Sequence, residues 1–112
     1  MKIALLVPSP LASESFRRSR EKFIPATSGC YVLTTFQREI LYIGLTVNLR
    51  RRINEHLDSA AKTELTTEGR AVLVHWTETT EVNKVERTWL NIHLLNEGRL
   101  PILNSVYSPT PT

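Results

Sequence analysis

The stretch "YIGLTVNLRRRINEHL", residues 42–57, decides the fold because its pattern changes from strand to helix within a few residues. Together with the two apolar residues before it, its start predicts a strand over 40–44 that stops at Gly44. From residue 48 onward, apolar side chains recur at every fourth position, which predicts an amphipathic helix over 48–62. The residues of this apolar stripe are Leu49, Ile53 and Leu57.

Two polar side chains border this stripe. Arg52 and His56 are four residues apart, so they project from the same face of the helix, one above the other. A guanidinium and an imidazole therefore stand at the edge of the buried surface. At the start of the helix, Asn48 or Thr46 can act as the N-cap.

A second strand is predicted just upstream. The run "CYVLTTF", residues 30–36, is rich in strand-favouring residues, and only "QRE", residues 37–39, separates it from the strand over 40–44. Strands joined by so short a connection pair antiparallel. We therefore expect Tyr31 and Tyr42 to lie close together at one end of this hairpin.

The second half of the chain supplies another strand and another helix. The run "RAVLVHWTE", residues 70–78, predicts a strand buried on both faces. A helix over 79–97 follows and ends at Gly98. Its predicted core stripe is Val82, Val85, Trp89, Ile92 and Leu94 or Leu95. Glu86 lies one position off this stripe, where it could form an ion pair, for example with Arg52, or hold a metal ion.

The N-terminal part carries a weaker helical pattern. In "SESFRRSREKFI", residues 13–24, Ser13 can cap a short helix whose thin apolar stripe is Phe16 and Phe23. Pro25 ends it, because proline disfavours a helical conformation at the preceding residue.

These elements predict an α/β (α+β) fold. We expect a small three-stranded antiparallel or mixed sheet flanked by helices, in the order ββαβα, with an extra N-terminal helix. The expected organisation is an N-terminal extension with a short basic helix over 1–24, one folded domain over 25–107 and a flexible tail over 108–112.

Composition and charge narrow the class of protein. A chain of 112 residues is enough for one small domain. No apolar run approaches the roughly 20 residues of a membrane helix, and we identify no export signal. Cys30 is the only cysteine, so no internal disulfide is possible and a cytoplasmic (intracellular) location is expected.

The net charge of +3 is mild, but its distribution is uneven. Two basic clusters are candidate contacts for nucleic-acid phosphates, with an ordinary solvated surface as the alternative. The residues are Arg17, Arg18, Arg20 and Lys22 in the first cluster and Arg50, Arg51 and Arg52 in the second.

Taken together, the order and spacing of these groups resemble the GIY-YIG nuclease family. The resemblance covers residues 23–104 and rests on six positions. The motifs are "GCY" at 29–31, "YIG" at 42–44, Arg52 and His56 on the following helix, Glu86 on the next helix and "PILN" ending at Asn104. The resemblance implies that residues 25–107 fold into a nuclease-like domain in which these groups lie close together.

The resemblance implies a role for each group in phosphodiester hydrolysis. Tyr31 would be the general base, with His56 as its proton acceptor or orienter and Tyr42 as a supporting hydrogen-bond donor. A free tyrosine has a pKa near 10, so the base would need help from neighbouring groups. Arg52 would bind the scissile phosphate through the paired hydrogen bonds that a guanidinium favours.

The remaining family positions would support this chemistry. Glu86 would hold one divalent ion, Mg²⁺ or Mn²⁺, as an oxygen ligand. Gly29 and Gly44 match the structural glycines of the motif, and Asn104 matches a late supporting asparagine. The implied function is a metal-dependent DNA endonuclease.

Two positions depart from the family pattern, and no separate module for reading DNA sequence is recognisable. Cys30 replaces an aliphatic residue, and Leu45 stands where many members carry a lysine or another polar residue. The alternative function is therefore a catalytically weak or inactive nucleic-acid-binding module. Contacts to DNA would be non-sequence-specific or structure-specific, unless a protein partner or a homodimer supplies specificity.

Overall fold

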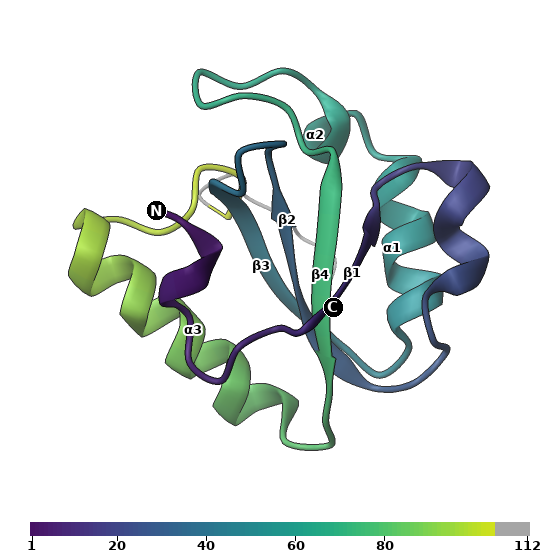
Figure 1. Ribbon diagram of the computed structural model, residues 1–112, viewed down its shortest axis with the longest axis horizontal. Helices are drawn as coiled ribbons and strands as arrows, with labels where there is room; N and C mark the ends of the chain where they lie inside the picture. Colours follow the sequence, from purple (N-terminus) through teal and green to yellow (C-terminus); the bar gives the residue numbers. More distant parts are fainter. Residues whose placement is uncertain (105–112) are drawn as a thin grey trace.

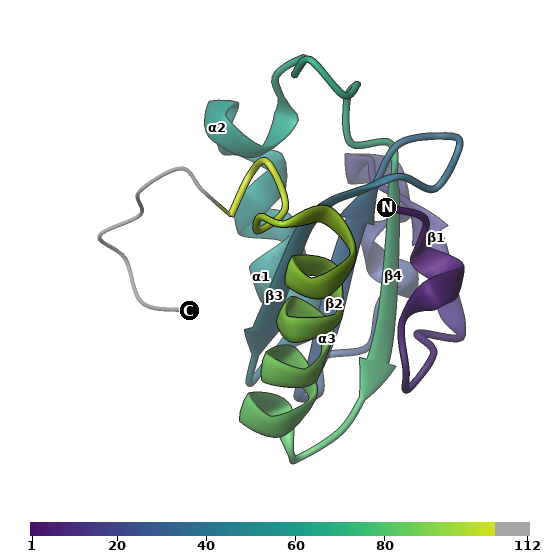
Figure 2. The same ribbon diagram turned by 90° about the vertical axis from the view of Figure 1, so that its left-hand side faces the viewer.

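The computed structural model describes residues 1–104, and its centre is a four-stranded antiparallel sheet with strand order β1-β4-β2-β3 (Figure 1). Helices α1 (Leu49–Leu57) and α3 (Val82–Glu97) cover opposite faces of this sheet (Figure 2). The predicted α+β class is confirmed, but the sheet has four strands rather than three. The strands are β1 (Ala12–Ser15), β2 (Gly29–Thr34), β3 (Ile40–Thr46) and β4 (Leu73–Glu78).

Each face of the sheet has its own hydrophobic core. On the α1 side, Leu49 and Ile53 pack in one cluster with Leu33 and Trp76. The cluster on the α3 side contains Met1, Leu6, Val32, Ile43, Val85 and Trp89. Because β2 lies between β4 and β3, all six of its residues are buried. Side chains on β2 are thus held between two packed layers.

The predicted N-terminal helix over 13–24 is wrong in its first half. Residues 12–15 form β1, which pairs with β4, and only the stretch Arg18–Phe23 is helical, as the 3₁₀ helix η2. Phe16 is buried in the core on the α1 side, whereas Phe23 is 53% exposed, so the two do not form one stripe. Pairing with β4, about 60 residues away, outweighs the local helical pattern.

The helix predicted over 48–62 is divided in two. Asn48 caps α1 as expected, because its Oδ1 accepts a hydrogen bond from the backbone N–H of Arg51 at 3.0 Å. The helix ends at Leu57, and the one-turn helix α2 (Ala60–Thr63) begins after Ser59, which has an extended backbone. Serine favours this position before a helix.

Strand β3 continues through Gly44 to Thr46, two residues further than predicted. Tyr31 lies opposite Gly44 in the register, and Leu33 lies opposite Tyr42. An irregularity next to this pair makes Leu41 the extra residue of a β-bulge, so Leu41 and Tyr42 both belong to the core on the α1 side. Tyr42 faces α1 through its regular pairing with Leu33, and the bulge adds Leu41 to the same side.

At the C-terminal end of α3, the buried residues differ from those predicted. Gly98 terminates the helix as expected, with φ +72° in the left-handed region. Leu94 and Leu95 are 45% and 86% exposed, however, and His93 is buried in their place. The stripe therefore continues from Trp89 by four residues to His93, whose Nδ1 lies 2.7 Å from the carbonyl oxygen of Arg99.

The outer edge of β3 is covered by segments from both ends of the described chain. The backbone N–H of Leu103 donates to the carbonyl of Leu41 at 2.9 Å, and that of Ile40 donates to the carbonyl of Met1 at 2.9 Å. Such coverage protects an edge strand from pairing with other chains.

Three further findings complete the description. Over residues 1–104, no helix is long and apolar enough to cross a membrane. The predicted tail at 108–112, and the predicted end of the domain at 107, lie outside the described residues. The boundary expected after residue 24 stays a prediction, although β1 joins residues 12–15 to the sheet.

Candidate active site

A buried hydrogen bond between β2 and α1 lies at the centre of the site. The phenol oxygen of Tyr31 and Nε2 of His56 are 2.5 Å apart, and the two residues are 0% and 3% exposed. The predicted four-residue spacing on α1 thus carries His56 into the core. The two rings are tilted by 51° to each other, with centroids 5.5 Å apart.

Tyr42 completes an aromatic triad with these two residues. Its ring centroid lies 6.0 Å from that of Tyr31 and 5.3 Å from that of His56. Tyr42 is 9% exposed, so it is the phenol nearer to the surface. The expectation that the hairpin brings both tyrosines together is confirmed by these distances.

Gly44 makes room for both phenols. A Cβ atom at this position would lie 2.5 Å from Cζ and Oη of Tyr31 and 2.8 Å from Cε2 of Tyr42. Gly29 likewise has no room for a side chain, because a Cβ there would overlap the carbonyl oxygen of Thr77 and approach a Leu49 methyl group to 2.8 Å. The two motif glycines are therefore required by close packing.

Arg52 lies beside the two phenols and keeps unused hydrogen-bonding capacity. Its Nη1 forms an ion pair with Glu55 at 3.0 Å, and its side chain is 13% exposed. Among the described residues, its Nε is the one buried side-chain nitrogen or oxygen without a hydrogen-bond partner. A buried N–H left unpaired is costly, which indicates a group that a ligand would satisfy.

Burial and charge set the protonation of the triad. Burial raises the pKa of Tyr31 well above its usual value, and the Arg52 guanidinium opposes this rise. The pKa of Tyr42 is raised for the same reason and is likewise opposed by Arg52. Burial, Arg52 and Lys62 together lower the pKa of His56 to about 3. Near neutral pH the phenols are therefore protonated and the imidazole is neutral, so Tyr31 can donate its O–H to Nε2 of His56.

Lys62 is a member of the site that the sequence interpretation missed. Its Nζ lies 4.7 Å from the centroid of the Tyr42 ring, and the residue is only 7% exposed. A lysine near the end of a predicted helix usually points into solvent. The break at Ser59 redirects the chain and turns α2 toward Tyr42, and no sequence pattern that we used reports this turn.

Glu86 comes from α3, on the other side of the sheet, yet its charge reaches the site. Its carboxylate raises the pKa of Tyr42, and burial raises the pKa of Glu86 itself. Within residues 1–104 its carboxylate forms no ion pair, and Arg52 pairs with Glu55 instead. Of the two interpretations of Glu86, an ion pair with Arg52 is thus not formed, and a metal ligand stays a prediction.

The surroundings of Glu86 are compatible with Mg²⁺ but not with a metal held by protein groups alone. In the described part of the chain no three His, Cys, Asp or Glu residues come together as ligands. Magnesium commonly binds through one or two carboxylates, with waters and substrate phosphates as the other ligands. A single half-buried carboxylate such as that of Glu86 fits that pattern.

Asn104 holds the edge of β3 next to the site. Its Oδ1 accepts from the backbone N–H of Ile43, and its Nδ2 donates to the carbonyl of Ile43, both at 2.8 Å. The side-chain amide thus pairs with the residue between Tyr42 and Gly44. This contact gives the predicted supporting asparagine a structural position.

The predicted DNA-binding residues have different surroundings. Arg18 contacts Asn54 and Asp58, Arg20 pairs with Glu14 at 3.0 Å, and Arg50 donates to the backbone carbonyls of Ile24 and Lys22. Lys22 lies 5.4 Å from the ring centroid of Phe23. Within residues 1–104, the exposed side chains of Arg17 and Arg51 have no hydrogen-bond or ion-pair partner. These last two are the most available for DNA.

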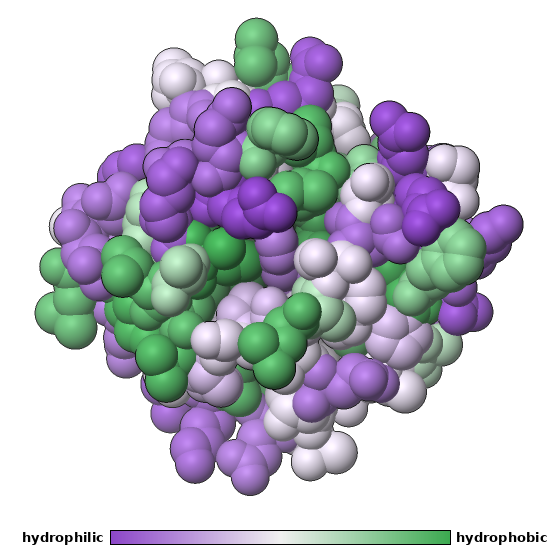
Figure 3. All heavy atoms as spheres, in the orientation of Figure 1, coloured by the Kyte–Doolittle hydropathy of each residue, from purple (hydrophilic) through white to green (hydrophobic). Residues whose placement is uncertain are grey.

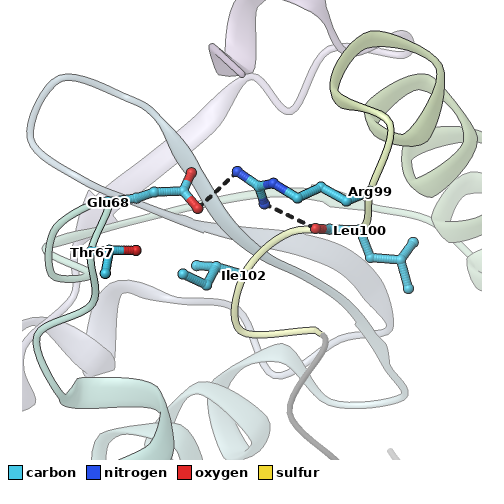
Figure 4. Close-up of a pocket in the computed structure, with 5 residues that line it drawn as sticks. All are labelled: Thr67, Glu68, Arg99, Leu100 and Ile102. Carbon is cyan, nitrogen blue, oxygen red and sulfur yellow. Dashed lines mark hydrogen bonds and ion pairs between the residues drawn. The ribbon is translucent and has the colours of Figure 1, made fainter.

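Other surface features lie apart from the site residues. One pocket is lined by Thr67, Glu68, Arg99, Leu100 and Ile102, and an ion pair of 2.9 Å joins Arg99 to Glu68 across it (Figure 4). The elements β3, α1 and α2, which carry most of the site residues, lie toward the left of Figure 2, and β3 lies toward the back in Figure 1. Figure 3 therefore shows the opposite side, where hydrophobic residues gather around the N-terminal segment and α3.

A small antiparallel sheet with two tyrosines, an arginine, a histidine and a nearby glutamate at one edge defines a nuclease-type domain. The model of the GIY-YIG catalytic domain matches residues 27–96, which is more than half of the chain, and the chain belongs to the GIY-YIG family. This confirms the resemblance seen in the motifs. Asn104 and β1 lie outside the matched residues. A search of curated proteins finds no match to the chain.

Proposed function

We propose that this protein is a divalent-metal-dependent endonuclease that hydrolyses DNA phosphodiester bonds. The family is one of nucleases, which supports the reaction class. The observation that carries the proposal is the Tyr31–His56 pair beside Arg52, a guanidinium with a buried and unsatisfied Nε. These groups provide a proton relay next to a binding group for an anion.

In this proposal, Tyr31 is the general base and His56 is its proton acceptor. The Tyr31 hydroxyl proton passes to Nε2 of His56, and the resulting phenolate takes a proton from the attacking water. Arg52 stabilises the phenolate and binds the phosphate, and Tyr42 donates a supporting hydrogen bond. Since Tyr31 is fully buried, attack also requires that water reach its oxygen past Tyr42.

Glu86 would hold the divalent ion, Mg²⁺ or Mn²⁺. When bound, the ion would supply Lewis-acid stabilisation of the charge that develops on the phosphate oxygens. The half-buried carboxylate, without an ion-pair partner in residues 1–104, supports this role. Asn104 supports the site by holding β3 in register.

The exposed basic residues support binding to DNA that does not depend on its sequence. Arg17, Arg51 and Lys22 would contact the DNA backbone, and phosphate contacts carry no sequence information. Arg18, Arg20 and Arg50 remain candidates for the same surface, but each must divide its hydrogen bonds between DNA and its partner in the protein. A protein partner or a homodimer would be needed for sequence specificity.

Nicking of a supercoiled plasmid tests this function. The protein should nick in Mg²⁺ and not in EDTA, and Arg52→Ala should lower the rate by about 10²–10³-fold. Glu86→Gln should abolish the nicking that Mg²⁺ supports, whereas Glu81→Gln, on the exposed start of α3, should leave the rate unchanged.

Two outcomes would change the assignment. Binding without cleavage in either ion would favour the inactive nucleic-acid-binding module, which the raised pKa of Tyr31 also favours. If Tyr31→Phe cleaves normally while Tyr42→Phe does not, the general base is Tyr42, the phenol nearer to the surface.

A further inference from the structure

Lys62 is a mostly buried residue whose ammonium has no opposite charge beside it. The residue is 7% exposed, and its Nζ rests over the face of the Tyr42 ring. Among residues 1–104 its ammonium has no carboxylate partner and no hydrogen bond. Because Nζ of Lys62 is not among the fully buried atoms that lack a hydrogen bond, the ammonium at the end of this mostly buried side chain still reaches solvent, where it can bind an anion.

A second cation with unused capacity lies close by. Arg52 and Lys62 both lower the pKa of His56, and Arg52 also contributes to the lowered pKa of Lys62, so the two charges act on each other. Glu55 pairs with Arg52 at Nη1 only, which leaves Nε unsatisfied. The local charge thus favours the arrival of an anion.

We propose that Lys62 is a second phosphate-binding residue, and that its ammonium and the Arg52 guanidinium bind the same DNA phosphate on the Tyr42 side of the site. This inference rests on the proposed function, since it concerns the substrate of that site. Arg52 supplies directional hydrogen bonds, and Lys62 supplies a compact charge. The contact with the Tyr42 ring holds the ammonium in place before DNA binds.

The arrangement also links DNA binding to the proton relay. The groups that face His56 are Tyr31 of β2, Tyr42 of β3, Arg52 of α1 and Lys62 of α2. A phosphate bound to the two cations offsets their effect on the imidazole. The pKa of His56 should therefore rise when DNA binds, which makes the imidazole a better acceptor for the Tyr31 proton.

Binding of a fluorescently labelled 12-base-pair DNA duplex in EDTA tests the proposal without cleavage. Lys62→Met retains most of the apolar stem and removes the charge. It should weaken binding about tenfold, as expected for one charged hydrogen bond, and reduce the slope of log affinity against log salt by about 1. Lys62→Arg should restore most of both. Lys84→Met, on the exposed face of α3, is the matched control and should change neither.

Histidine NMR provides a readout that general loss of fold would not mimic. In the wild type, the duplex should raise the pKa of His56, and this rise should be smaller in Lys62→Met. If Lys62→Met binds DNA with wild-type affinity and salt slope, the inference is wrong, even when the protein cleaves DNA normally. If the duplex binds in a Lys62-dependent way but no metal supports cleavage, the inference stands and the nuclease proposal fails.

Discussion

Gly44 occupies a position in β3 that faces both phenol rings. At the scale of single residues, it explains why "YIG" ends in glycine: the opposite residue in the register is Tyr31, whose ring lies across the missing side chain. The sequence interpretation treated this glycine as the end of a strand. The physical reason for the glycine is a contact with the opposite strand of the hairpin, and the sequence of β3 alone does not reveal this contact.

Gly44→Ala should therefore disturb the active-site tyrosines as well as lower the stability of the fold. The added methyl group would lie 2.5 Å from Tyr31 Oη, so the ring must move, at a cost of about 1–3 kcal/mol in the free energy of unfolding. Urea denaturation measures this cost, and plasmid nicking should fall close to background.

Gly98→Ala is the comparison for this substitution. It meets no atom within 4 Å but is strained by its φ of +72°, so it should lose about 1 kcal/mol and keep wild-type nicking. If Gly44→Ala were as stable and as active as the wild type, the close packing of Tyr31 on Gly44 would be contradicted.

The predictability of the site also differs residue by residue. Arg52 and His56 could be placed together because their spacing is local to one helix. Tyr31 and Tyr42 followed from one tight hairpin. The place of Lys62 in the site could not be predicted. It depends on the helix break at Ser59, and packing sets the direction in which the chain continues after that break.

At the scale of elements, long periodic segments were predictable and short paired ones were not. The helices α1 and α3 follow from their apolar stripes, which are buried as expected at Ile53, Val85 and Trp89. Strand β1 has only four residues, and its partner β4 lies far along the chain. Its pairing is a long-range contact, so no local pattern in "ASES" reports it.

The edge of β3 depends on one side chain for part of its pairing. Asn104→Ala would leave both backbone groups of Ile43 without their present partner, at a cost of about 1–3 kcal/mol. Amide exchange at Ile43 should accelerate, as measured by hydrogen-exchange NMR. Asn96→Ala removes a hydrogen bond on exposed α3 and should leave that amide unchanged. Unchanged protection in Asn104→Ala would show that β3 does not need this contact.

Substitutions of two neighbouring arginines on α1 should have different effects, because one arginine supports packing and the other is expected to bind DNA. Arg50 joins α1 to η2 through the carbonyls of Ile24 and Lys22, so Arg50→Ala should lower stability by about 1 kcal/mol. Arg51 is exposed and has no such partner among residues 1–104. Arg51→Ala should keep the stability and reduce the salt slope of DNA binding by about 1. Equal effects of the two substitutions on both measurements would contradict this division.

At the scale of the whole molecule, the three histidines are all buried, so folding changes how tightly each binds a proton. The pKa of His56 is lowered to about 3 and that of His75 to about 4, mainly by burial, and the pKa of His93 is lowered as well. His75 is held by Thr34, with 3.0 Å between Nε2 and Oγ1. These values lie below the ordinary value of 6.5 for an exposed histidine.

The sign of the pH dependence follows from these directions. Between pH 6.5 and about 4, the unfolded chain binds protons that the folded chain does not, so the free energy of unfolding falls as the pH falls. Each of His56 and His75 should contribute a loss of roughly 2 kcal/mol between pH 6.5 and 4.5. The raised pKa of Glu86 acts in the opposite direction, and the lowered pKa values of Glu39 and Glu97 extend the loss to lower pH.

Urea denaturation at several pH values between 7 and 4.5, followed by tryptophan fluorescence, measures this dependence, since Trp76 and Trp89 are both buried. His75→Gln retains a group that can bond to Thr34 and removes one titrating site, so its curve should be flatter than that of the wild type by roughly 2 kcal/mol over this range. Lys84→Gln removes an exposed charge and should keep the wild-type slope. A wild-type stability that does not change from pH 7 to 4.5 would mean that the imidazoles accept protons inside the fold, and the neutral His56 on which the proton relay depends would then be excluded.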